Sequence, residues 1–301
     1  MTENGQTAFE LRRELPDAAL LERSRRLVGF KERFTRLSGQ MRLLADPQGV
    51  KTWAHRYHGG NEQLSAALSD RYPLIIFHGD VGTGKTITAE CSADALSRQL
   101  DTDGFLLKLS TRVRGIGHVG EMSTLIGDAF DEAIAMAGRR RFVAMIIDEG
   151  DALAFNRGAE RAHHEDKVGV NTLIQKIDDG RQLEGRLLVI LCTNRFGAID
   201  PAVLRRAALI DEFTRPDRLE RTELFRMVLS GVPVSEDILE KLVLDTGASE
   251  GRPAFTFSDI QSKLLPAAIA RAYPQRSLTA EDLLEAVLET EPSPIMKDGS
   301  D

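Results

Sequence analysis

Short apolar runs alternate with amphipathic stretches along the first two thirds of the chain. The runs cover residues 74–77, 105–109, 142–147 and 187–192. Because each is short, continuous and rich in large apolar residues, we predict four strands that are buried on both faces. Apolar residues at helical spacing separate the runs, over 87–100, 121–137 and 171–179. Strands alternating with helices predict an α/β domain, with a mostly parallel sheet covered by helices on both faces.

Helical patterns precede the first of these runs. The spacing of Leu11, Leu15 and Leu21 predicts a helical extension over 1–26. The same spacing then predicts two further helices, over 34–44 and 53–70.

Helical spacing also continues after the last run, almost to the end of the chain. We therefore expect the α/β domain to extend over 27–214 and a small all-α domain to follow over 215–290. Thr279, with Asp282 three residues later, marks the start of the last helix. The polar segment 291–301 contains two prolines and is expected to be disordered.

Composition narrows the class of protein. The formal net charge is −7 and the isoelectric point is near 5.5, which argues against a general nucleic-acid binder. Cys91 and Cys192 lie far apart without a metal-ligand pattern, so neither a zinc site nor a disulfide framework is indicated. The chain has no run of eighteen apolar residues and no apolar leader. We expect a soluble, cytoplasmic protein without a membrane partner.

The strongest motif lies directly after the first apolar run. The segment from Gly79 to Thr86 fits G-x-x-x-x-G-K-[ST] and precedes a helical pattern. Its three glycines, Gly79, Gly82 and Gly84, allow the backbone N–H groups to approach a phosphate, and Val81 and Thr83 lie between them. Lys85 would neutralise the β- and γ-phosphates of ATP, and Thr86 would offer its hydroxyl to Mg²⁺. The pattern therefore predicts an ATP site.

Two later strands end in residues that complete such a site. Asp148 and Glu149 follow the third run, where Asp148 can hold Mg²⁺ and Glu149 can act as the general base. Asn194 follows the fourth run, and its uncharged amide can hydrogen-bond the attacking water or the γ-phosphate. Two adjacent acids alone would favour a solvated loop, but their position after an upstream phosphate loop favours a role in the ATP site.

A pair of arginines comes shortly after the fourth strand. Arg205 and Arg206 stand on or after a predicted helix that begins near Asp200. Either guanidinium can reach the γ-phosphate of a neighbouring subunit, as arginine fingers do.

In their order along the chain, these motifs resemble those of the AAA+ ATPases, specifically the protein-remodelling AAA group, over about 27–287. The resemblance implies that the all-α domain is the lid and that Val28 and Gly29 lie near the adenine. It also makes Asp148 and Glu149 the Walker B pair and Asn194 sensor 1. Arg252 is a candidate for sensor 2, although the segment from Phe257 resembles members that lack this arginine.

Segment 204–209 is similar to the short arginine-finger segment of the pachytene-checkpoint-type ATPases, which remodel HORMA-domain proteins. This resemblance makes Arg206 the first choice for the finger and Arg205 the second. It further implies a homo-hexamer whose pore loop, with His118 and Val119, grips a protein substrate. The compact chain is similar to bacterial members that restrain antiphage nucleotide signalling by disassembling a HORMA protein complex.

Two other functions remain open. A DNA-associated ATPase of the loader or transposition-helper type would carry a basic pore or lid, whereas this chain is acidic overall. A nucleotide-gated scaffold would bind ATP without turnover, which the presence of Glu149 opposes.

Overall fold

The computed structural model describes residues 8–60, 63–64, 66, 71–110, 121–156 and 164–296. Within these residues, a six-stranded sheet has the order β1-β3-β4-β5-β2-β6. Its strands are β1 (Phe9–Leu15), β2 (Leu74–Gly79), β3 (Gly104–Leu109), β4 (Phe142–Ile147), β5 (Leu187–Thr193) and β6 (Ala207–Phe213). All neighbouring strands pair in parallel except β1, which runs antiparallel to β3. The four strands predicted from the apolar runs are confirmed, as is the mostly parallel sheet.

The prediction of helix over 9–15 is wrong, because this segment is strand β1. Its burial alternates, with Phe9 and Leu15 buried and several charged residues between them exposed. Such a pattern suits an edge strand, and pairing with β3 along its whole length overrides the local helical spacing. The sixth strand, β6, was not predicted, because its segment carries charged residues and is only half-buried.

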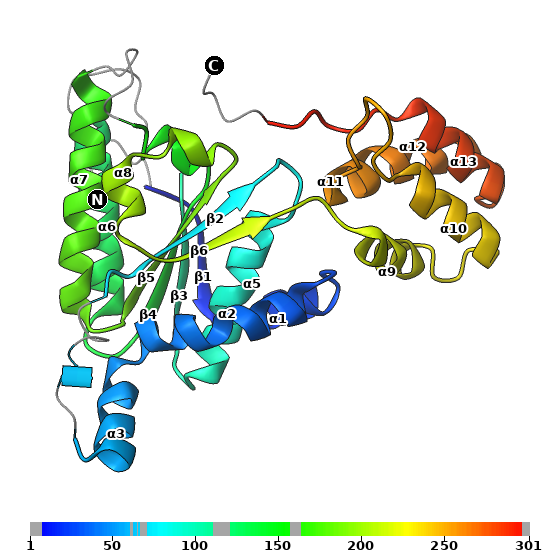
Figure 1. Ribbon diagram of the computed structural model, residues 1–301. Helices are drawn as coiled ribbons and strands as arrows, with labels where there is room; N and C mark the ends of the chain where they lie inside the picture. The colour runs from blue at the N-terminus through cyan, green and yellow to red at the C-terminus, as the bar shows by residue number, and fades with distance from the viewer. Residues whose placement is uncertain are drawn as a thin grey trace.

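Helices cover both faces of the sheet (Figure 1). On one face lie α6 (Glu121–Ala137) and α7 (His164–Gly180), which share a core with strand residues such as Ile76 and Met145. On the other lie α1 (Ala18–Arg25), α2 (Phe30–Ala45) and α5 (Lys85–Gln99), around Phe77 and Ile146. Both faces of β4 and β5 are therefore buried, which explains their continuous apolar sequences. The short helix α8 (Pro201–Leu204) precedes β6, and α3 (Pro47–His58) projects from the domain.

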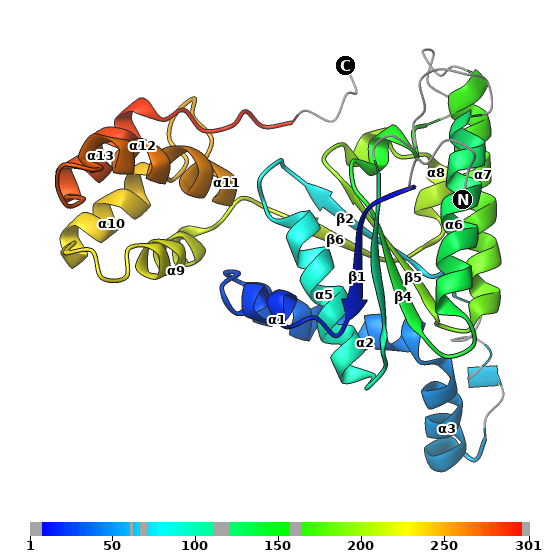
Figure 2. The same cartoon turned by 180° about the vertical axis from the view of Figure 1, so that it is seen from behind.

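A helical domain, called the lid below, follows β6 and stands beside the sheet (Figure 2). It has its own apolar core, formed around Phe225, Leu242, Phe255 and Leu283. The Thr279 side chain accepts from the Asp282 N–H in a capping box, as predicted. The lid consists of α9 (Arg218–Val228), α10 (Glu236–Asp245), α11 (Phe257–Asp259), the π-helical η5 (Ile260–Leu264), α12 (Leu265–Ala272) and α13 (Ala280–Glu289).

The segment 291–296 was expected to be disordered, but it runs back across the lid toward the sheet (Figure 2). The Ser293 backbone N–H and hydroxyl donate to the buried Asp259 carboxylate, at 3.0 and 2.7 Å. The Met296 N–H reaches Asp80 Oδ1 at 3.1 Å. These contacts hold the segment, whereas residues 297–301 lie outside the described part. Among the described residues, no helix is long and apolar enough to cross a membrane.

Candidate nucleotide-binding site

The phosphate loop joins the end of β2 to the start of α5. Gly79 and Gly82 have φ angles of 139° and 78°. A Cβ at Gly79 would lie 2.0 Å from the Phe213 carbonyl oxygen, and one at Gly82 would lie 2.7 Å from Ser258 Cβ. Gly84 caps α5 with a φ of 92°. Only glycine suits these positions, and the resulting loop carries N–H groups at a helix N-terminus, which suits an anion.

Lys85 lies across this loop. Its Nζ donates to the carbonyl oxygens of Gly79 and Asp80, at 2.9 and 2.7 Å, and only 6% of the residue is exposed. Burial lowers the pKa of the ammonium, although the nearby Asp148 and Asp80 carboxylates oppose that shift. The Thr83 hydroxyl also donates to the Asp80 carbonyl, and Val81 is exposed at the tip of the loop. A cation thus occupies the place where phosphate charge needs neutralising.

Thr86 and Asp148 are in direct contact. The Thr86 hydroxyl lies 3.0 and 2.9 Å from the two carboxylate oxygens of Asp148. They come from α5 and the end of β4, which are distant in sequence but meet at the carboxyl edge of the parallel sheet. Both groups offer oxygen ligands, which suit a hard cation such as Mg²⁺, so these residues fit the metal.

Glu149 is exposed and adopts a left-handed backbone conformation with a φ of 50°. A non-glycine residue in this region carries strain, and such residues cluster at functional sites. The next residue, Gly150, packs so closely on Leu191 that a Cβ would lie 2.3 Å from Leu191 Cδ2. This tight packing fixes the turn that leaves the Glu149 carboxylate in solvent beside Asp148.

Asn194 follows β5, which lies between β4 and the strand of the phosphate loop. Asn194 therefore follows the strand that lies between the strand leading to Asp148 and the strand leading to the phosphate loop. The residue before it is anchored, since the Thr193 hydroxyl donates to Asp151 Oδ1 at 2.9 Å and accepts from the Arg195 N–H.

Sequence reasoning missed Lys108, a residue of β3 that touches the same carboxylate. Its Nζ lies 3.2 Å from Asp148 Oδ2 and 3.0 Å from Glu10 Oε1. Burial alone would lower the pKa of Lys108, but the contacts with Glu10 and Asp148 outweigh burial and raise it. Its charge within an otherwise apolar run was the available signal.

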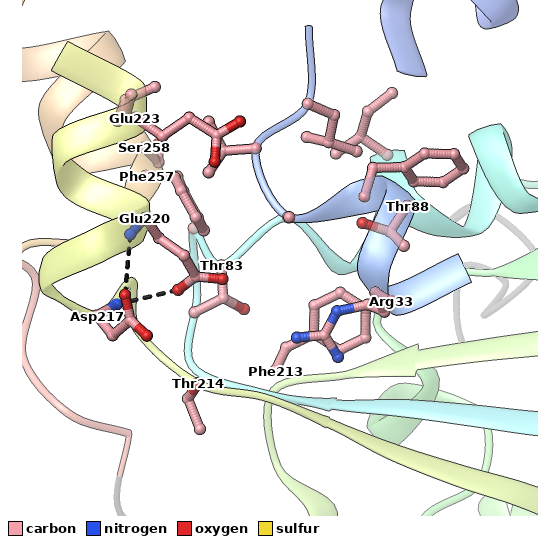
Figure 3. Close-up of a pocket in the computed structure, with 18 of the residues that line it drawn as sticks. Arg33, Thr83, Thr88, Phe213, Thr214, Asp217, Glu220, Glu223, Phe257 and Ser258 are labelled. Carbon is pink, nitrogen blue, oxygen red and sulfur yellow. Dashed lines mark hydrogen bonds between the residues drawn. The ribbon is translucent and has the colours of Figure 1, made fainter. Parts of the chain in front are cut away.

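A cavity of about 650 Å³ opens between the phosphate loop, the start of α2 and the lid (Figure 3). Val28, Gly29, Gly82, Thr83 and Gly84 all line it, together with Phe257 and Ser258 of the lid. Gly29 has a φ of 72°, and a Cβ there would lie 3.0 Å from Glu220 Oε1 of α9. The cavity thus adjoins the phosphate loop and has both apolar and polar walls, which fits an adenine and a ribose.

Arg252 does not line this cavity. Its guanidinium donates to the Asp245 carbonyl at the end of α10 and stacks 5.1 Å from the centre of the Phe255 ring. The geometry therefore does not bring Arg252 to this cavity. Phe257 and Ser258 face the cavity instead, in line with the resemblance to members that lack this arginine.

The two candidate finger arginines have different surroundings. Arg206 donates hydrogen bonds to the Asp178 carboxylate of α7 through Nε and a terminal nitrogen, the latter at 2.8 Å. Arg205 is exposed. Both residues follow α8, and the Arg206 side chain is 21% exposed. His118 and Val119, which the sequence predicts for the pore loop, lie outside the described residues.

A model of the "ATPase family associated with various cellular activities (AAA)" matches residues 75–215. CD-NTase-associated protein 6 from Escherichia coli strain KTE188 is 48% identical over 286 residues, which are 95% of this chain and 96% of that protein. The chain is an AAA ATPase of the CD-NTase-associated protein 6 family.

Solved structures extend the likeness of this AAA ATPase to the whole fold. A chain of the E. coli MS115-1 HORMA:CdnC:Trip13 complex is 41% identical, with a TM-score of 0.89 over 96% of this chain and 97% of that one. Rhizobiales Trip13 is 34% identical, with a TM-score of 0.72 over 95% of this chain and 99% of that one. The α/β domain and the lid thus share the arrangement of Trip13 proteins.

Proposed function

We propose that this chain hydrolyses ATP and uses the energy to remodel a HORMA-domain protein, in a bacterial antiphage system that signals through nucleotides. The observation that carries the hydrolysis is the contact of Thr86 with Asp148, next to the strained and exposed Glu149. A site that only binds nucleotide would not need the Glu149 carboxylate beside Asp148.

Each residue of the site then has a part. Lys85 would exchange its two carbonyl partners for phosphate oxygens, and Thr86 and Asp148 would hold Mg²⁺, directly or through water. Bound magnesium would supply positive charge that offsets the charge of the phosphates. Glu149 takes the proton of the attacking water, and Asn194 orients that water.

The proposed partner follows from the relatives. The chain of the E. coli complex that this protein resembles was solved together with a HORMA protein and CdnC. This protein matches that chain over nearly its whole length, so its surfaces are expected to suit a similar partner. Removing the HORMA protein from a nucleotidyltransferase would restrain the signal.

We also propose that the chain works as a homo-hexamer that threads its substrate through a central pore. In such a ring, Arg206, or Arg205 in its place, completes the ATP site of the neighbouring subunit. Arg206 would have to leave Asp178 to do so, which would couple hydrolysis to a change in α7. His118 and Val119 would grip the polypeptide in the pore.

The test uses Glu149→Gln, which keeps the phosphate loop but removes the base. In ATP, this variant is expected to form a six-subunit ring and to retain an added bacterial HORMA-domain protein. Glu250→Gln, an exposed residue of the lid, is the matched control. Wild type with that HORMA protein should turn over ATP faster than wild type alone.

A HORMA protein that neither binds Glu149→Gln in ATP nor stimulates the wild type would contradict the proposed partner. Stimulation by DNA that falls as salt rises would instead favour a DNA-associated ATPase.

A further inference from the structure

The pairing of strand β1 with β3 is irregular beside the proposed ATP site. Phe9 pairs with Leu109 and Leu11 pairs with Lys108, so Glu10 is an extra residue that has no partner position on β3. This arrangement is a β-bulge, and bulges re-aim side chains at sheet edges and beside active sites. Here the bulge points the Glu10 carboxylate at the Lys108 ammonium, 3.0 Å away.

Lys108 continues this contact to the metal-binding carboxylate. Its Nζ lies 3.2 Å from Asp148 Oδ2, and only 18% of its side chain is exposed. Oδ2 therefore contacts Lys108 and Thr86, whereas Oδ1 contacts Thr86 and the Glu149 N–H, at 3.1 Å. With donors on both oxygens, the plane of the Asp148 carboxylate is fixed.

We propose that Lys108 is a positioning residue for ATP hydrolysis, which orients Asp148 toward Mg²⁺ and is itself held by Glu10 of strand β1. This inference rests on the proposed ATP hydrolysis. It makes the first strand of the chain part of the nucleotide site. Partners of metal-binding carboxylates affect the metal without touching it, and losing one typically costs 10–100-fold in metal affinity or activity.

The alternative is a structural pair that only fastens β1 to β3. Both roles would make Lys108→Met less stable, so stability does not separate them. The effect of Mg²⁺ on nucleotide affinity separates the two roles, because a pair that only joins β1 to β3 would leave this effect unchanged. The ion pair between Arg12 and Glu132 provides the control, since Arg12 also belongs to β1 but binds α6, at 2.7 Å.

The experiment compares wild type, Glu10→Gln, Lys108→Met, the double variant and Arg12→Met. Affinity for a fluorescent ADP analogue is measured with and without Mg²⁺, and kcat and KM for ATP are measured in parallel. Lys108→Met should lose about tenfold of the affinity that Mg²⁺ adds and about tenfold in kcat. Glu10→Gln should show a smaller loss of the same kind.

The double variant should be no worse than Lys108→Met alone, since Glu10 acts through Lys108. Arg12→Met should match wild type. If Mg²⁺ raises the nucleotide affinity of Glu10→Gln and of Lys108→Met as much as it raises that of wild type, the proposal is overturned. If Lys108→Met does not fold, Glu10→Gln alone decides. A wild type that binds nucleotide with Mg²⁺ but never hydrolyses ATP would refute the hydrolysis and leave the Mg²⁺ comparison intact.

Discussion

Arg215 binds Asp80 and so connects the strand before the lid to the phosphate loop. Its Nε lies 2.7 Å from Asp80 Oδ2, and both side chains are mostly buried, at 10% and 15% exposed. The same guanidinium donates to the Ala254 carbonyl of the lid, at 2.6 Å. The Asp80 carbonyl in turn accepts from Lys85. The lid and the phosphate-binding lysine are therefore linked through one ion pair.

Arg215→Met should weaken both the fold and nucleotide binding. It leaves the mostly buried Asp80 carboxylate without its cation, which we expect to cost about 2 kcal/mol of unfolding free energy. If about 1.4 kcal/mol of that loss reaches the site, affinity for ADP falls about tenfold. Chemical denaturation and a titration with ADP measure the two effects.

Arg218→Met is the matched control. It breaks the pair of Arg218 with Glu240 in the lid, whose side chains are 61% and 59% exposed. Such a pair contributes at most about 1 kcal/mol. Equal effects of the two variants on ADP affinity would contradict a special role for Arg215.

Asp259 gives the lid a pH-dependent stability. Burial by itself would raise the pKa of this carboxylate, but the contacts with Lys263, Thr256 and Ser293 outweigh burial and hold it well below its usual value. A carboxylate with a depressed folded-state pKa stabilises the fold above its unfolded-state pKa of about 3.9, and that contribution is lost as pH falls further.

The unfolding free energy of wild type should therefore exceed that of Asp259→Asn most at neutral pH. The difference should stay constant down to about pH 5 and shrink below about pH 4. Urea denaturation of both proteins from neutral pH to below about pH 4 measures this difference. A difference that does not change with pH would show that the Asp259 charge adds nothing. Ser293→Ala should reproduce part of the loss at neutral pH, since it removes one donor to Asp259.

The sequence predicted the parts of the site whose determinants are local. The phosphate loop follows from three glycines and a lysine at fixed spacing, and Asp148 and Glu149 follow from the end of a buried strand. The parallel sheet then brings Thr86 and Asp148 together, because the carboxyl ends of its strands share one edge. These residues can therefore be predicted from local motifs and from the general geometry of a parallel sheet.

The missed features depend on contacts between distant segments. Strand β1 looks helical in isolation, and only its pairing with β3 reveals both the strand and the bulge at Glu10. Lys108 and Arg215 carry no motif, and their roles come from the carboxylates that the fold places beside them. Arg252 illustrates the opposite case, since it follows a glycine at the expected place but turns to the Asp245 carbonyl.

Arg206→Ala should lose ATP hydrolysis on the order of 10³-fold while still binding ADP, because a missing arginine finger affects only the transition state. Mixing Arg206→Ala with Glu149→Gln should restore part of the activity. In mixed rings, a subunit that retains Glu149 can receive Arg206 from its Glu149→Gln neighbour. Steady-state turnover of the two variants, alone and mixed, measures this.

Asp178→Asn serves as the control for the arginine, since it removes the partner of Arg206 within the chain and keeps the guanidinium. It should retain turnover. If unmixed Arg206→Ala hydrolyses ATP and Arg205→Ala does not, the arginine finger is Arg205 rather than Arg206. If neither single variant loses activity, the site is not completed by a neighbouring subunit through these residues.

The most direct measurement is ATP turnover by wild type and Glu149→Gln at matched concentration, with Glu250→Gln as the control. The structure places Glu149 exposed beside Asp148, in a strained turn that packing on Leu191 fixes. Wild type and Glu250→Gln should therefore hydrolyse ATP, while Glu149→Gln binds it and does not turn it over. Equal turnover by all three proteins would contradict the assignment of the base, and no turnover by wild type in the presence of its partner would contradict the proposed ATP-driven function.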